Sequence, residues 1–126
     1  MIGWDPAATA LLELLPRTGR GPKRDGIFAL WLTVRVARDV RGGSPALERA
    51  HRRRVAALEQ RLSSLTVPPP LRRALAAAIA ELLAPDPSGA ARALSQLVAP
   101  ARETAGLDAA NAMASAARAA RLGASP

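Results

Sequence analysis

The sequence predicts an all-α fold, a single compact helical bundle of about five to seven short helices. Leucine and alanine recur at helical spacing along most of the chain, and hydrophobic residues make up 49% of it. Prolines recur at intervals, often directly after a residue that can cap a helix. No stretch alternates apolar and polar residues with the period of two that a half-buried strand requires. A length of 126 residues fits one domain, which we expect to span residues 1–126.

The prolines set the predicted helix boundaries. Pro6 follows Asp5 and Pro45 follows Ser44, and proline at the first helical position wastes no hydrogen bond while the preceding side chain caps free amides. Pro87 follows Asp86 in the same way, and Pro70, after a pair of prolines, and Pro100 also mark predicted helix starts. The predicted helices span residues of about 6–15, 26–41, 45–64, 70–84, 87–98, 100–105 and 108–122.

Two of these helices have unusual compositions. The helix at 26–41 is apolar on nearly every side in its first half, so we expect neighbours all around it. Its expected core anchors are Phe28, Trp31 and Leu32. Further along it, Arg35 and Asp39 have the spacing of a surface ion pair. The helix at 108–122 is mostly alanine, which predicts close packing against another backbone, either inside the domain or on a partner.

Residues 48–62, "ERAHRRRVAALEQRL", contain five arginines and the only histidine. On a helical wheel the leucines and Val55 form one buried stripe, and His51 falls within it. We therefore expect His51 to be a packed side chain with one hydrogen-bonded nitrogen, not a metal ligand or a catalytic base.

The arginines of this helix spread over the rest of the wheel. Arg52 lies at the favourable spacing from Glu48, which predicts local neutralisation. Arg49 and Arg53 lie one turn apart without an acidic neighbour, so they are the most available for a partner. Two interpretations remain open: a solvated helix face with weak ion pairs, or a face that contacts an anion.

Residues 16–25 predict a basic, glycine-containing, flexible loop before the second helix. No strand precedes it and no Gly-Lys-Ser/Thr ends it, and Asp25 as a helix cap would occupy the place of a phosphate, so a nucleotide-binding loop is not expected. A contact with an anionic surface and a plain connection both remain open. The candidate anion or nucleic-acid contacts are Arg17, Arg20, Lys23, Arg24, Arg49, Arg53, Arg72 and Arg73.

The composition excludes several chemistries. The chain has no cysteine and no tyrosine, its acidic residues are scattered, and neither an acid/base pair nor a set of metal ligands is recognisable. We expect no enzyme, no cofactor, no metal and no small-molecule substrate. The longest apolar run, residues 26–34, is too short to span a membrane, so a cytoplasmic protein without membrane association is expected.

The net charge of +8 predicts an anionic partner, although a genome rich in G and C would also produce the excess of arginine, which supplies seventeen of the eighteen basic residues. The preferred hypothesis is a non-catalytic interaction or assembly subunit that docks on a larger or acidic partner, or on itself, through apolar and alanine-rich faces and a basic surface. The alternative is a nucleic-acid-binding protein, such as a small architectural subunit of a nucleoprotein complex. Because Phe28 and Trp31 lie in the most buried-looking segment, its contacts would be to phosphates and tolerant of sequence.

Overall fold

The computed structural model describes residues 4–40, 48–83 and 88–124, and within these ranges the chain forms seven α-helices and no strand. The helices are α1 (Trp4–Leu14), α2 (Pro22–Val40), α3 (Glu48–Ser63), α4 (Pro69–Leu82), α5 (Gly89–Gln96), α6 (Val98–Ala105) and α7 (Leu107–Ala124). The prediction of an all-α bundle is therefore confirmed, and each predicted helix corresponds to one of these. The predicted caps at Ser44 and Asp86 lie outside the described residues.

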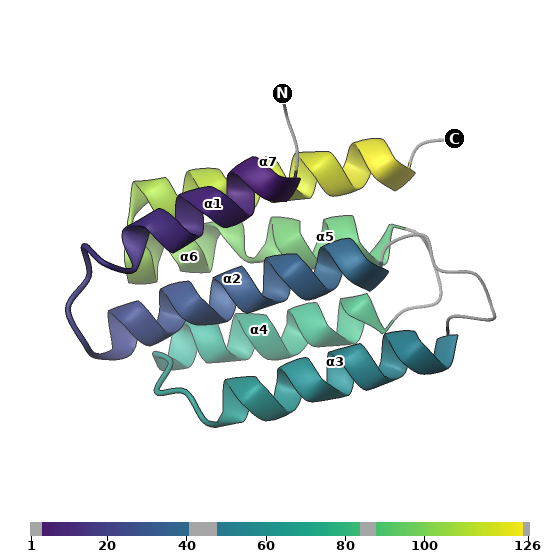
Figure 1. Ribbon diagram of the computed structural model, residues 1–126, viewed down its shortest axis with the longest axis horizontal. Helices are drawn as coiled ribbons and strands as arrows, with labels where there is room; N and C mark the ends of the chain where they lie inside the picture. Colours follow the sequence, from purple (N-terminus) through teal and green to yellow (C-terminus); the bar gives the residue numbers. More distant parts are fainter. Residues whose placement is uncertain (1–3, 41–47, 84–87, 125–126) are drawn as a thin grey trace.

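The helices form two layers (Figure 1). In one layer α1, α2 and α3 follow each other in chain order, and α1 contacts α2 while α2 contacts α3. In the other, α5 and α6 lie nearly end to end between α7 and α4. The first and last helices, α1 and α7, pack side by side and so join the two layers along one edge of the bundle.

Helix α2 is the centre of the bundle, as its apolar composition predicts. It contacts each of the six other described helices. Its fully buried side chains include Ile27, Leu30 and Val34. Gly26 permits a close approach here, because a Cβ atom at this position would lie 3.1 Å from Leu71 Cδ2 and 3.3 Å from Thr104 Cγ2.

The prediction that Phe28 and Trp31 anchor the core is wrong, whereas Leu32 is buried as expected. Both aromatic side chains are only half-buried and pack against the edge of the core. Their partial burial is explained by the helix that lies next to them. The rings face the α3 side of α2, and α3 is the outermost helix, with described contacts to α2 and α4 alone.

Helix α7 packs inside the domain. The sequence left open whether it packs inside the domain or on a partner, and the structure shows the first arrangement. It contacts α1, α2, α5 and α6. Its alanines at positions 109, 110, 112, 116, 117, 119 and 120 are buried, and so is Met113. Small side chains let these backbones approach closely, as the alanine-rich composition of this helix predicts.

The second helix begins at Pro22, four residues earlier than predicted. Proline at the first helical position provides a suitable start. Lys23 and Arg24 thus belong to the first turn of α2 rather than to the preceding connection. Asp25 accepts a hydrogen bond of 2.7 Å from the backbone N–H of Thr66. This bond ties the start of α2 to the α3–α4 connection. None of the helices in the described ranges is both long and apolar enough to cross a membrane.

Candidate functional site

Helix α3 carries the arginine-rich segment on the outside of the bundle. Val55 and Leu58 are buried and form its inner face. His51 lies on the same face, and its Nε2 donates a hydrogen bond of 2.7 Å to the backbone carbonyl of Leu82. The prediction of a packed histidine with one satisfied nitrogen is confirmed. Since a carbonyl only accepts, the proton must reside on Nε2.

The His51 bond has a structural role that the sequence did not reveal. Leu82 is the last residue of α4, and its carbonyl is one of the four that a helix end leaves without an intrahelical partner. The side chain therefore caps the C-terminus of α4 from the first turn of α3, where few other contacts join the two helices.

Replacing His51 with alanine is expected to lower the free energy of unfolding by about 1 kcal/mol, because it removes this capping hydrogen bond. The measurement is urea denaturation followed by circular dichroism. Gln60→Ala, at an exposed position of the same helix, is the control and should change stability very little. Equal effects of the two variants would contradict the capping role.

Four arginines surround the first two turns of α3, and all four side chains are exposed. Arg49 and Arg53 make no hydrogen bond, ion pair or ring contact with any described residue. Arg54 donates one weak hydrogen bond, of 3.3 Å, to the backbone carbonyl of Asp39. The expected neutralisation of Arg52 involves the side chain of Glu48, which lies outside the described part of the chain.

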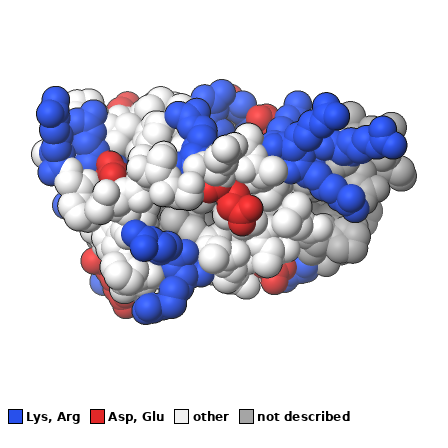
Figure 2. All heavy atoms as spheres, turned by 90° about the horizontal axis from the view of Figure 1, so that it is seen from below, with Lys and Arg blue, Asp and Glu red and all other residues white. Residues whose placement is uncertain are grey.

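The other predicted contacts lie at the opposite end of the bundle. They belong to the α1–α2 connection and to the beginnings of α2 and α4: Arg17, Arg20, Lys23, Arg24, Arg72 and Arg73. Arg72 donates a hydrogen bond of 3.0 Å to the carbonyl of Val67. The structure thus separates the candidate residues into two groups: Arg49 and Arg53 in α3, and the other six at the opposite end of the bundle. Figure 2 shows basic side chains in several groups along this side, the largest where α3 begins.

Between α2 and α3 lies a feature that sequence reasoning missed. We name it the α2–α3 seam, and it consists of Phe28, Trp31 and Arg35 of α2 with Arg54 and Arg61 of α3. The rings of Phe28 and Trp31 stack with their centroids 5.7 Å apart and their planes at 21°. The guanidinium of Arg35 lies 4.9 Å from the centroid of the Trp31 ring, and that of Arg61 lies 5.7 Å from the Phe28 ring.

Part of this seam could have been found from spacing alone. One face of α2 carries five residues at alternating intervals of four and three: Arg24, Phe28, Trp31, Arg35 and Arg38. The predicted Arg35–Asp39 ion pair is not formed, because Arg35 stacks on Trp31 instead. Asp39 lies 3.6 Å from Arg38 Nε.

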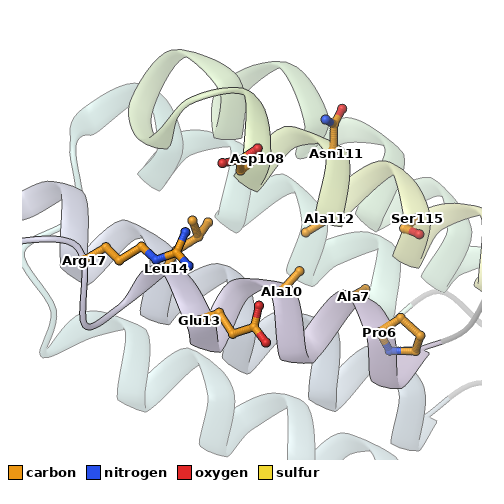
Figure 3. Close-up of a pocket in the computed structure, with 10 residues that line it drawn as sticks. All are labelled: Pro6, Ala7, Ala10, Glu13, Leu14, Arg17, Asp108, Asn111, Ala112 and Ser115. Atoms are coloured by element: carbon orange, nitrogen blue, oxygen red, sulfur yellow. The ribbon is translucent and has the colours of Figure 1, made fainter.

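A second candidate is an open groove between α1 and α7 (Figure 3). Its volume is about 330 Å³, and alanines from both helices form its floor. Glu13, Arg17, Asp108 and Asn111 stand on its rim, and all four side chains are exposed. Water therefore reaches each of these four side chains, which weakens any electrostatic discrimination between ligands. The groove has space for a small molecule but no buried polar group to orient one.

Within the described ranges, no three histidine, aspartate or glutamate side chains lie close enough together to hold a metal ion. Comparison of the chain with protein-family models, with curated proteins and with solved structures finds no match. In the described residues, exposed arginines gather in the first two turns of α3 and in the adjacent α2–α3 seam. A guanidinium group can bind an anion through paired N–H groups.

Proposed function

We propose that this protein is a non-catalytic nucleic-acid-binding protein that contacts phosphates through the arginines of α3. The proposal rests mainly on Arg49 and Arg53. Both side chains are exposed, they lie one helical turn apart, and neither has a partner among the described residues. A guanidinium is always charged at neutral pH and binds phosphate oxygens through paired N–H groups.

The distribution of charge supports a polyanion as the partner. Basic groups lie along the side of the bundle that Figure 2 shows. Lys23, Arg24 and Arg73 are exposed near the starts of α2 and α4. A nucleic acid offers phosphates at regular intervals and can engage separate groups at once, whereas a small anion can occupy only one. Contacts of this kind are tolerant of sequence.

Docking through an apolar or alanine-rich face loses support in comparison. The alanine face of α7 is buried against other helices of the same chain. The exposed large hydrophobic side chains that the structure describes are distributed over α1, the end of α4 and both ends of α7: Leu12, Leu83, Leu107 and Leu122. Singly exposed leucines are common on protein surfaces and do not indicate an interface.

The double substitution Arg49→Glu and Arg53→Glu is expected to abolish binding to labelled DNA and RNA near physiological salt. It should also lower the slope of log affinity against log salt by about two, one unit for each lost phosphate contact. Fluorescence anisotropy over a series of salt concentrations measures both quantities.

The matched control is Arg102→Glu with Arg118→Glu, which changes the net charge equally at exposed positions of α6 and α7. If the proposal is correct, the control weakens binding much less and leaves the slope nearly unchanged. Equal losses in the two double variants would show that net charge alone drives binding and would refute the assignment to α3.

A second candidate function is docking on an acidic protein. The spacing of Arg49 and Arg53 favours it, since side chains one turn apart, roughly 5 Å, match carboxylates one turn apart on a partner helix. A wild-type protein that binds no DNA or RNA even at low salt would favour this candidate over the first.

A further inference from the structure

The α2–α3 seam combines two features that phosphate binding alone does not require. One is a pair of stacked aromatic rings whose residues are not fully buried. The other is a set of exposed arginines, of which Arg35 of α2 lies over the Trp31 ring and Arg61 of α3 lies over the Phe28 ring. Arg54 of α3 is also exposed and donates a hydrogen bond to the carbonyl of Asp39. Aromatic platforms beside positive charge are the two elements that single-strand binding proteins combine.

The orientation of Trp31 leaves part of its ring available. Its Nε1 atom is buried and has no hydrogen-bond partner among the described residues, so the polar edge of the indole points into the protein. The remaining exposed area of the side chain is therefore apolar ring. Arg35 lies over this ring, and a planar guanidinium can itself stack on a base or move aside for one.

The charges around the seam suit a polyanionic strand. Asp25 accepts the hydrogen bond from Thr66 at one end, and Asp39 lies next to Arg38 at the other. The guanidinium of Arg35 lies over the Trp31 ring and that of Arg61 over the Phe28 ring, so positive charge lies directly on the aromatic faces. Because α2 and α3 are antiparallel, the seam ends beside the arginine-rich first turns of α3 (Figure 1).

We propose that the α2–α3 seam binds single-stranded nucleic acid, with unpaired bases stacking on Phe28, Trp31 and the guanidinium groups above them. This inference rests on the proposed function and makes it more specific. In a duplex the base faces are covered by their neighbours, so duplex binding can use only the arginines. A single strand can use both arginines and rings, and we therefore expect preference for the single strand.

The first test leaves the protein unchanged. Fluorescence anisotropy compares a labelled oligothymidine with an oligomer of the same length whose backbone carries no bases. Stacking is typically worth enough per base that the base-bearing strand should bind at least about tenfold more tightly. Equal affinities for the two strands would overturn the inference and leave the phosphate-binding function standing.

A second test uses the two tryptophans. Stacking of a base on Trp31 should quench the intrinsic fluorescence, while Trp4 is buried, with 7% of its surface exposed, and should contribute little to the change. In Trp31→Phe the quenching should disappear, but the affinity for oligothymidine should remain close to that of the wild type, because phenylalanine also stacks. Quenching that persists in Trp31→Phe would contradict stacking on Trp31.

The double substitution Phe28→Leu and Trp31→Leu removes both rings while keeping apolar side chains. We expect roughly a tenfold or larger loss of affinity for the single strand and little change for the duplex. Circular dichroism establishes that the variant is folded. An equal loss for both ligands, or no loss for either, would refute stacking at the seam. If the wild type binds no nucleic acid at all, the proposed function fails and the inference fails with it.

Discussion

Replacing Leu30 with alanine is expected to lower the free energy of unfolding by about 3–5 kcal/mol. Leu30 has no exposed surface and lies in α2, which contacts every other described helix, so the surrounding side chains cannot all move to fill the space. A domain of this size is typically stable by roughly 5–15 kcal/mol, so this loss would be a large fraction of the total. Urea denaturation monitored by circular dichroism measures it directly.

Leu12→Ala provides the matched control for this prediction. It removes the same atoms from a side chain that is 44% exposed on α1, and it should cost less than about 1 kcal/mol. Similar losses for Leu12→Ala and Leu30→Ala would contradict the central position of α2.

The second large effect is expected from overpacking in α7. Ala116 has no exposed surface, and α7 approaches its neighbours through small side chains. Ala116→Leu would insert three further carbon atoms between these helices, which is expected to destabilise the fold by about 1–3 kcal/mol. A decrease in the melting temperature and in the urea midpoint would show this effect.

Ala114→Leu tests whether the effect arises from packing. Ala114 is exposed on the same helix, and leucine and alanine have similar helix propensities. This control should change the free energy of unfolding by less than about 0.5 kcal/mol. If Ala116→Leu is tolerated as well as Ala114→Leu, α7 does not pack as closely as described.

Much of the fold was predictable because its helix signals are local. Pro69 and Pro70 begin α4, and Gly106, with a φ of 97°, ends α6 with a conformation that glycine adopts easily. The stripe of leucines on α3 identified its inner face, including the half-buried His51. Each of these signals depends on residues that are close in the chain.

The candidate site was less predictable because it depends on which neighbours cover which residues. The first half of α2 is apolar on nearly every side, so its sequence could not reveal that α3 leaves Phe28 and Trp31 half-exposed. In the same way, Arg35 had an acidic residue at ion-pair spacing but stacks on an aromatic ring instead. The candidate arginines on different helices could be separated into two groups only when the helices were placed.

The sequence by itself determined the fold class, the approximate helix boundaries and the central position of α2, because periodicity, capping and proline geometry act over a few residues. Only the tertiary structure decided that α7 packs inside the domain, that His51 caps α4 and that the Phe28 ring of α2 meets Arg61 of α3. These features bring together residues far apart in the chain. Their partners are therefore set by how whole helices pack, and local propensity carries no information about that.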